Sequence, residues 1–249
     1  MNRGDKVRMS VELLLNNNKL NKDKNRIVMH IIKLLIEKED KEMFNKMYRL
    51  NINKQKDLTF SMYLGRDAKF LRNEIEVPAQ KVIVNFSTSD SALGITIYNA
   101  FTKYKGLEIP IKDNMALINK VNIVKTRPIT SEKVRFITKS PIVVRSHNGD
   151  NEKTYYNSLL DESGQEVFIE NLKYQIKDKF PDISMKDLKQ IKINIIWSKD
   201  VKVKHYEIII PSNICEFEIE AKTYILEEIY LNGVGGRKSQ GFGYVDLVE

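Results

Sequence analysis

The stretch Gly233-Val-Gly-Gly-Arg-Lys-Ser-Gln-Gly-Phe-Gly243 is the most informative part of the sequence. Five of the 11 glycines of the chain lie in it. Glycine tolerates positive φ and lets a ligand approach the backbone closely. A helix end followed by a tight turn would need only one or two glycines. With two basic residues at its centre, the loop is predicted to face phosphate groups. The residues expected to contact them are Gly235, Gly236, Arg237, Lys238 and Ser239.

The elements around this loop predict a small α+β domain. The loop lies between a predicted helix and a final predicted strand. Upstream, hydrophobic patterns predict a strand broken near Pro141, a helix stopped by Pro181, and two further strands. The resulting order is β-α-β-β-α-β, which is typical of ferredoxin-like domains. The predicted strands are 134–144, 191–197, 205–210 continued by 216–221, and 241–248, and the predicted helices are 166–180 and 222–231.

The first half of the chain predicts the same order. Apolar residues at a spacing of 3.6 indicate a helix over 24–37, and Thr88-Ser89-Asp90 can cap a second helix that runs to about Tyr104. Strands are predicted at 7–15, 58–64, 81–87 and 115–125. We therefore expect an α+β protein of two tandem ferredoxin-like domains, 1–127 and 128–249. Pro128 places an extended backbone at their boundary.

Composition excludes several classes of protein. The chain has 249 residues, of which 42% are hydrophobic, so it can bury a substantial core. It contains no run of 18 apolar residues, and we expect a cytoplasmic protein without a membrane partner. Its single cysteine, Cys215, excludes an intramolecular disulfide framework and a cysteine-based zinc cluster. No His, Asp or Glu cluster has convincing metal-ligand spacing, so no metal and no cofactor is predicted.

The positive charge is concentrated in the first half. The whole chain has 41 Lys and Arg against 33 Asp and Glu, a net charge of +8. Residues 1–127 carry 24 basic and 14 acidic residues, which gives +10, and residues 128–249 carry 17 and 19, which gives −2. A basic half indicates a polyanionic partner, because each neutralised phosphate releases counterions. Lysine-rich composition without any binding role is the alternative.

The glycine-rich loop, placed in the last β-α-β unit of a tandem ferredoxin-like chain, resembles the RAMP superfamily of CRISPR-associated proteins. The whole chain is similar to the repeat-processing endoribonucleases of that superfamily. Leu58-Thr-Phe-Ser61 resembles the strand that follows their first helix. Ser140-Pro-Ile-Val-Val-Arg-Ser146 resembles the opening strand of their second domain, and the pair Tyr155-Tyr156 fits the same region.

This resemblance implies that the chain cleaves CRISPR precursor RNA within its repeats, without a metal ion. The 2′-hydroxyl attacks the adjacent phosphate, leaving a 2′,3′-cyclic phosphate and a 5′-hydroxyl. The implied partners are precursor and processed guide RNA, with other CRISPR effector subunits or a second copy of the chain as further candidates. Two alternatives stay open: a non-catalytic RNA-binding subunit of an effector complex, and a ferredoxin-like protein that binds a small ligand.

The family keeps its catalytic groups on the first helix and in the loop after it. His30 lies on the polar side of the predicted helix 24–37, and histidine suits proton transfer near neutral pH. Many members have a histidine just after this helix, whereas this chain has none between 31 and 57. Either His30 acts from the helix, or catalysis is weak or absent. Tyr48 and Lys54 are the other catalytic candidates, with Lys46 and Lys56 as further basic residues.

Two further residues are candidates for RNA contact. Arg145 and His147 lie in the stretch that follows the predicted opening strand of the second half. His205 lies in an alternating sequence, Lys202-Val-Lys-His205, and is expected to be an exposed strand residue, with an RNA contact as the alternative.

Overall fold

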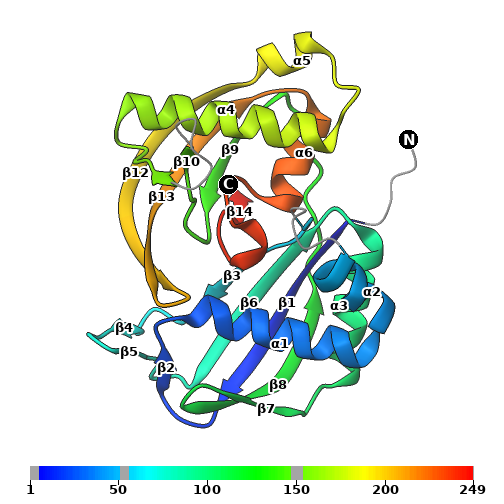
Figure 1. Cartoon of the computed structure of the whole chain (residues 1–249), viewed down its shortest axis with the longest axis vertical. Coiled ribbons are helices and arrows are strands. Elements are labelled where there is room, and N and C mark those ends of the chain that lie inside the picture. Colours follow the sequence, from blue (N-terminus) through cyan, green and yellow to red (C-terminus); the bar gives the residue numbers. More distant parts are fainter. Residues whose placement is uncertain (1–5, 51–55, 147–153, 249) are drawn as a thin grey trace. The chain divides into compact units, whose positions relative to one another are not determined.

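The computed structural model describes residues 6–50, 56–146 and 154–248 (Figure 1). Its contacts divide the chain into two compact units. Unit 1 comprises Met1–Thr126 together with Lys204–Ile208, and unit 2 comprises Arg127–Val203 with Ile209–Glu249. The sequence-based division placed residues 204–208 in the second domain, whereas the structure groups them with unit 1. Among the described residues, no helix is long and apolar enough to cross a membrane.

Unit 1 is built on a five-stranded antiparallel sheet. The strand order is β3-β6-β1-β8-β7, so the first strand lies at the centre. Val11 of the central strand faces Val84 on one neighbour and Val121 on the other. The strands are β1 (Val7–Leu15), β3 (Thr59–Tyr63), β6 (Lys81–Thr88), β7 (Glu108–Ile111) and β8 (Asn114–Ile123).

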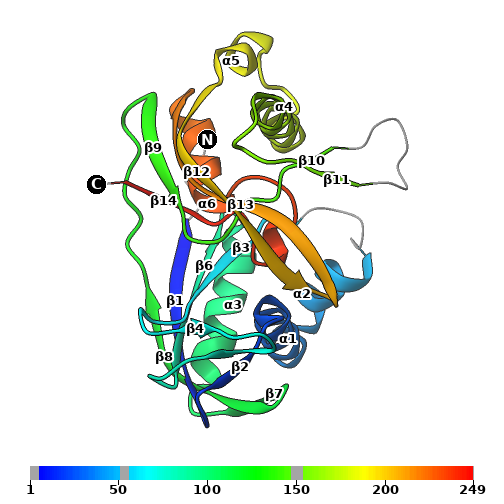
Figure 2. The ribbon, with the colours of Figure 1, turned by 90° about the vertical axis from the view of Figure 1, so that its left-hand side faces the viewer.

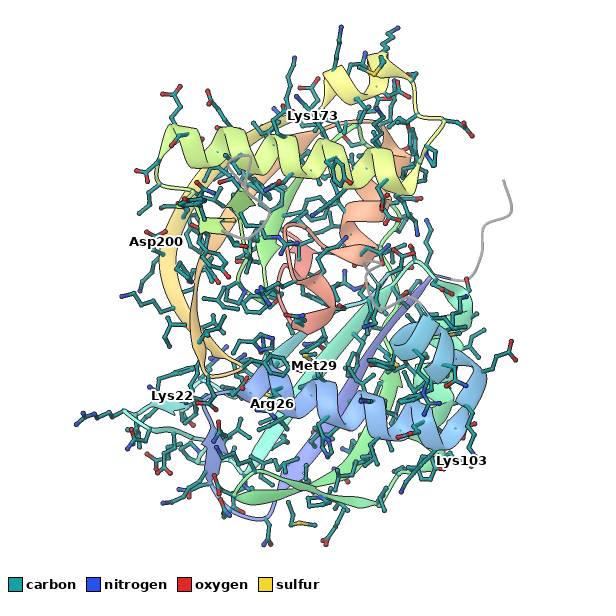
Figure 3. The ribbon with its side chains drawn as sticks, in the orientation of Figure 1. Lys22, Arg26, Met29, Lys103, Lys173 and Asp200 are labelled. Carbon is teal, nitrogen blue, oxygen red and sulfur yellow. The ribbon has the colours of Figure 1, made fainter. Side chains whose placement is uncertain are left out.

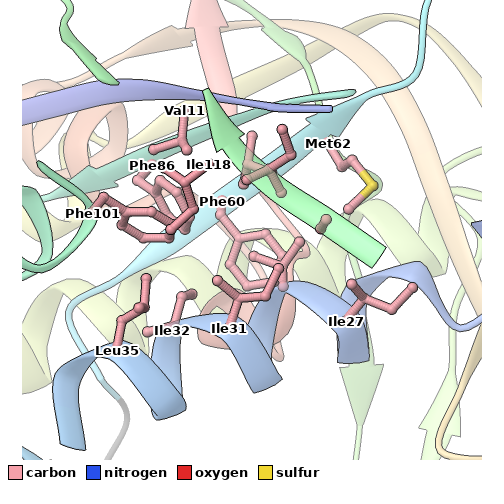
Figure 4. Close-up of a cluster of buried hydrophobic side chains, with 14 of the residues drawn as sticks. Val11, Ile27, Ile31, Ile32, Leu35, Phe60, Met62, Phe86, Phe101 and Ile118 are labelled. Atoms are coloured by element: carbon pink, nitrogen blue, oxygen red, sulfur yellow. The ribbon is translucent and has the colours of Figure 1, made fainter. Parts of the chain in front are cut away.

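Two helices, α1 (Lys24–Glu39) and α3 (Ser91–Lys103), cover one face of this sheet (Figure 2). Within the predicted capping stretch 88–90, Asp90 is the cap, since its carboxylate accepts the Leu93 backbone N–H at 3.0 Å. The apolar stripe of α1 packs into the core beside aromatic rings of the sheet and of α3 (Figure 4). The buried stripe comprises Ile27, Val28, Ile31, Ile32, Leu35 and Ile36, and the rings beside it include Phe60, Phe86 and Phe101.

Several short elements of unit 1 were not predicted. The polar stretch after α1 forms α2 (Lys41–Asn45) and a π-helical turn, η1 (Lys46–Leu50). Asp40 separates α2 from α1, because its carboxylate accepts the Met43 N–H at 2.8 Å. A small sheet in the order β2-β5-β4 joins the loops at one end of the unit. Its strands are β2 (Lys19–Asn21), β4 (Lys69–Phe70) and β5 (Glu74–Glu76).

Unit 2 repeats the arrangement with a four-stranded sheet. The order β12-β13-β9-β14 places its first strand between the third and the last, as in unit 1. Helices α4 (Glu162–Lys179), α5 (Met185–Gln190) and α6 (Thr223–Asn232) accompany it, and Phe136, Phe168 and Phe217 are fully buried in its core. The prediction of tandem ferredoxin-like α+β domains is confirmed. The strands are β9 (Lys133–Thr138), β12 (Lys192–His205), β13 (Ile208–Glu220) and β14 (Val245–Leu247).

Strands β12 and β13 are much longer than predicted, and the single strand predicted at 205–210 is wrong, because residues 206 and 207 form the turn between them. They run into a two-residue turn at Tyr206 and Glu207, whose φ values are 48° and 64°. Positive φ at both central residues is the geometry of hairpin turns that match the twist of the strands. Two further short strands, β10 (Arg145–Ser146) and β11 (Tyr155–Tyr156), pair with each other in unit 2.

Candidate catalytic surface and glycine-rich loop

The outer face of α1 presents a row of basic side chains. Arg26, His30 and Lys33 recur at spacings of four and three residues, so they lie on one side of the helix. All three are exposed, because the opposite side of α1 is buried against the sheet. Figure 3 labels Lys22 and Arg26 near the start of this helix. The core stripe thus fixes the rotation of α1 and turns His30 outward.

The hairpin tip, Lys204–Ile208, contacts the start of this helix within unit 1. The Tyr206 N–H donates to Asp23 Oδ2 at 3.0 Å, and His205 Nδ1 lies 3.4 Å from Asp23 Oδ1. His205 is fully buried, so the expectation of an exposed strand residue is wrong. His205 is the last residue of β12, and this end of the strand contacts Asp23, the residue before α1, instead of solvent. The Arg26 guanidinium lies 5.1 Å from the centre of the Tyr206 ring.

His30 lines a cavity of about 420 Å³ in unit 1. The carboxylate of Glu207, from the hairpin tip, lies on the same cavity. Its pKa is lowered first by a hydrogen bond and charge from Lys204, and further by Lys112 and Arg26. The cavity therefore places two acidic residues, Asp23 and Glu207, among several cations. Its lining residues are Asn21, Asp23, Arg26, Ile27, His30, Pro110, Ile111, Lys112 and Glu207.

Tyr48 lies in a cluster of cations and aromatic rings. Its ring centre is 5.2 Å from that of Phe44, 4.5 Å from Lys56 Nζ and 5.7 Å from Lys33 Nζ. Burial raises the pKa of Tyr48 to about 12, with a further contribution from Tyr206. Burial also lowers the pKa of Lys56, and the nearby charge of Lys33 adds to this effect. The Tyr48 hydroxyl therefore keeps its proton at neutral pH and can act as a hydrogen-bond donor.

Two residues connect Tyr48 with the row on α1. Lys33 is one helical turn from His30 and lies beside the Tyr48 ring. Tyr206 contacts Arg26 and interacts electrostatically with Tyr48. We call the surface formed by Arg26, His30, Lys33, Tyr48, Lys56 and Tyr206 the α1 surface. It contains two of the three predicted catalytic residues, and the third, Lys54, lies outside the described residues.

Sequence reasoning missed the contribution of the hairpin tip. Asp23, Lys112 and Tyr206 come from three distant segments, and no local pattern associates them with His30. No sequence signal marked the turn at residues 206 and 207, which lie inside the predicted strand 205–210 and include neither Gly nor Asn. A hairpin turn built from Tyr and Glu is costly unless other contacts stabilise it.

The glycine-rich loop of unit 2 folds tightly onto the segment before β10. Gly236 N–H donates to Val143 O and Gly243 N–H donates to Pro141 O, both at 2.8 Å. A Cβ on Gly243 would lie 1.8 Å from Val234 O, and one on Gly235 would lie 2.7 Å from Ile142 Cγ2. These glycines therefore allow close packing of the loop against its own domain. They also adopt positive φ, of 69° at Gly243 and 78° at Gly235.

Helix α4 fixes the position of this loop relative to β10. Its residues Asn171 and Gln175 are one helical turn apart. Asn171 Nδ2 donates to Arg145 O, and Gln175 Nε2 donates to Gly235 O, each at 2.8 Å. Arg145 lies next to Gly236, since a Cβ on that glycine would be 3.2 Å from Arg145 Nε. Two predicted RNA contacts, Arg145 and the glycine-rich loop, are therefore adjacent.

Burial separates the predicted contact residues of the loop into two groups. Gly235 and Lys238 are buried, whereas Gly236, Arg237 and Ser239 are half-buried. Arg237 has φ 59° and donates from Nη1 to Gln240 Oε1 at 3.0 Å. Its Nε atom is buried and has no hydrogen-bond partner in the described part of the chain. His147 lies outside that part, and no group of three His, Cys, Asp or Glu able to hold a metal is found within it.

One family model matches the second half of the chain. Residues 124–247 match the model described as "CRISPR associated protein Cas6, C-terminal". A comparison with curated protein sequences gives no match.

Solved structures share the fold over nearly the whole chain. One is described as "An RAMP protein binding different RNA substrates", with a TM-score of 0.82 and 22% identity over 98% of this chain and 100% of that one. A second, on "a Cas6-related gene from Pyrococcus furiosus", has a TM-score of 0.83 and 20% identity over 98% and 99%. A third, "CRISPR associated protein Cas6", has a TM-score of 0.76 and 17% identity over 98% and 100%.

At these identities the structures show the fold, and the family model adds the sequence evidence. The predicted resemblance to the CRISPR-associated repeat-processing family of the RAMP superfamily is confirmed, since residues 124–247 match the Cas6 C-terminal model and the fold is that of Cas6 and RAMP proteins.

Proposed function

We propose that this protein is a metal-independent endoribonuclease that cleaves CRISPR precursor RNA within its repeats. The observation that carries the proposal is the α1 surface, where an exposed histidine lies among cations and a protonated tyrosine. The family match and the RNA-binding relative support an RNA substrate. The processed guide RNA is then the product, and further effector subunits or a second copy of the chain stay predictions.

His30 is proposed to transfer the proton. In this reaction the 2′-oxygen forms a bond to phosphorus and loses its proton, while the bond from phosphorus to the 5′-oxygen breaks and that oxygen gains a proton. An imidazole can serve at either step as general base or general acid. His30 projects into a cavity that is open to solvent and large enough for a nucleotide, which permits access to the scissile phosphate.

The cations and Tyr48 are proposed to stabilise the developing charge on the phosphate. Lys33 and Lys56 supply positive charge close to the Tyr48 ring. The Tyr48 hydroxyl, protonated at neutral pH, can donate to a non-bridging oxygen. This assigns Tyr48 an electrostatic role and leaves proton transfer to His30.

The glycine-rich loop is proposed to hold the RNA backbone. Arg237 Nε is buried without a hydrogen-bond partner in the described residues, and buried polar groups normally have one. A phosphate oxygen would satisfy it. The half-buried positions Gly236 and Ser239 lie beside it, and Arg145 adds a second guanidinium.

The alternative is an RNA-binding subunit without catalysis. The observation that favours it is the absence of any histidine between residues 31 and 57, where many members of the family have one. His30 is then the only histidine in the first 146 residues. Cleavage therefore depends on a single imidazole.

A cleavage assay with labelled repeat RNA in excess EDTA tests the proposal. The wild type should produce a 2′,3′-cyclic phosphate, and His30→Ala should be slowed about 10²-fold or more. Glu37→Ala, exposed two turns further along α1, is the matched control and should cut normally. RNA with deoxyribose at the cleaved position should resist cutting. Binding without cutting by the wild type would overturn the catalytic proposal and favour the alternative.

A further inference from the structure

Unit 2 contains a second cavity, of about 520 Å³, that the proposed function does not use. It lies beside β11, between the segment that follows this strand and the middle of the β12 and β13 hairpin. Its floor contains the buried residues Ser212 and Asn213, and its rim contains the exposed residues Asp200 and Lys202. Figure 3 labels Asp200 on the edge strand β12. The lining residues are Tyr156, Asn157, Ser158, Asp200, Val201, Lys202, Pro211, Ser212 and Asn213.

Buried hydrogen bonds make the walls of this cavity rigid. Asn213 Oδ1 accepts the Leu159 N–H at 2.8 Å, and its Nδ2 donates to Asn157 O at 3.1 Å. The backbone N–H of Asn157 donates to Val144 O at 2.9 Å. The segment that forms one wall is thus attached at three points, two on β13 and one at the residue that precedes β10. Binding to a preformed cavity of this kind requires little ordering of the protein, so little conformational entropy is lost.

The cavity adjoins the glycine-rich loop. Tyr156 pairs with Arg145 across the β10 and β11 ladder, and Arg145 lies next to Gly236. The Tyr156 side chain packs against a small cluster of Val143, Ile210 and Phe242, of which Phe242 belongs to the loop itself. A chain of phosphates that contacts the loop and Arg145 would therefore bring its next nucleotides over Tyr156.

The rim presents an acceptor and a donor on one side. Asp200 and Lys202 are two residues apart on β12, so their side chains project from the same face of the strand. The Ser158 hydroxyl donates to Asp200 Oδ1 at 2.7 Å, which orients the carboxylate. A carboxylate repels phosphate, so in an RNA site it faces hydrogen-bond donors, which are base edges and ribose hydroxyls. Carboxylates accept hydrogen bonds from base amino groups, and lysine donates to base carbonyl oxygens.

We propose that this cavity binds one unpaired guanine base of the RNA. Guanine offers N1–H and N2–H donors to Asp200 and its O6 acceptor to Lys202, with the Tyr156 ring as an apolar wall for the base. Single-stranded RNA is commonly read in this manner, by stacking and by hydrogen bonds to an exposed base edge. This inference rests on the proposed function and adds a specificity-determining site to it.

Fluorescence anisotropy of the full-length protein with labelled oligonucleotides tests the site. The probes are a uridine oligomer of about twelve nucleotides and versions with one central guanosine, adenosine or cytidine. The wild type should bind the guanosine oligomer about tenfold more tightly than the uridine oligomer. Asp200→Ala should abolish this advantage while binding the uridine oligomer at least as well, because a negative charge is removed. Lys202→Ala should lower the advantage of the guanosine oligomer and weaken the binding of both oligomers.

Matched controls separate base reading from charge. Lys199→Ala removes the same charge as Lys202→Ala from the opposite face of β12 and should preserve the guanosine advantage. Asp182→Ala, at an exposed position of unit 2, should also preserve it. A wild type that binds all four oligomers equally, or an advantage that survives in Asp200→Ala, would overturn the site. If the wild type cleaves repeat RNA but shows no base preference, only this inference fails. If it binds no RNA at all, the proposed function fails as well.

Discussion

The guanidinium of Arg26 lies 5.1 Å from the ring centre of Tyr206, although the two residues come from opposite halves of the sequence. Arg26 belongs to α1, and Tyr206 lies in the hairpin tip that unit 1 takes from the second half of the chain. The contact places an aromatic ring at one end of the row that carries His30. Tyr206 thereby links this row to Tyr48, whose pKa it helps to raise.

This contact predicts energetic coupling between Arg26 and Tyr206. Cation–π pairs at exposed sites contribute about 0.5–1 kcal/mol. In a double-mutant cycle with Arg26→Ala and Tyr206→Leu, the coupling in the free energy of unfolding should reach that size. Pairing Tyr206→Leu with Lys41→Ala, an exposed basic site on α2, should give additive effects. Additive effects for Arg26 as well would show that the tip does not depend on this contact.

Asp23 is predicted to hold the hairpin tip against α1. Asp23→Ala removes the acceptor of the Tyr206 N–H and the carboxylate that faces the buried His205. Leaving buried polar groups unpaired costs about 1–3 kcal/mol, so the free energy of unfolding should fall by that amount. Hydrogen exchange should accelerate at residues 204–208. Asp67→Ala, at an exposed site of unit 1, is the control, and unchanged exchange in Asp23→Ala would contradict the assignment.

Local sequence patterns predicted the helix that carries His30 but not the hairpin tip that contacts the start of this helix. The 3.6-residue spacing of apolar side chains predicted a helix at 24–37, and α1 spans Lys24–Glu39 with His30 on its exposed side. Both properties depend on the helix alone. The hairpin tip could not be found in this way, because strand β12 is exposed along much of its length and lacks a strict alternation. Its turn also contains neither Gly nor Asn, so no turn signal marked residue 206.

Prediction of the glycine-rich loop from local sequence patterns has the same limit. The glycines at 235 and 243 indicated a backbone that other residues cannot adopt, and their positive φ angles agree with that. The pattern did not reveal what approaches the backbone. In the structure, the nearest atoms belong to Ile142, Val143 and Val234 of the same unit. A single sequence identifies a need for glycine, whereas the partner that imposes it comes from tertiary packing.

This packing predicts different costs at two glycines that both have positive φ. Gly243→Ala should destabilise the protein by about 3 kcal/mol or more, because left-handed strain adds to a clash with Val234 O. Gly65→Ala has φ 92° but meets nothing within 4 Å, so it should cost only about 1 kcal/mol. Chemical denaturation of both variants measures the difference. Equal losses of stability would mean that backbone strain alone accounts for the cost at Gly243 and that the clash with Val234 O adds nothing.

The raised pKa of Tyr48 predicts a specific titration. The wild-type minus Tyr48→Phe difference in tyrosinate absorbance should be centred near pH 12, instead of near 10 for an exposed tyrosine. The folded state then retains the proton between pH 10 and 12 while the unfolded state loses it. The contribution of Tyr48 to stability is therefore present below pH 10 and lost as pH rises through 12. A difference centred near 10 would contradict the buried position of the hydroxyl.

The two lysines beside Tyr48 predict a change in the salt dependence of RNA binding. Each phosphate contact that is lost lowers the slope of log K against log salt by about 1. Lys33→Met and Lys56→Met should each weaken binding of repeat RNA and lower the slope by that amount. Lys103→Met removes the same charge from α3, where Lys103 pairs with Glu39 at 2.8 Å, and should leave the slope unchanged. Anisotropy titrations over a range of salt concentrations make the measurement. If all three variants shift the slope equally, the lysines act only through net charge, and the α1 surface does not contact the RNA backbone.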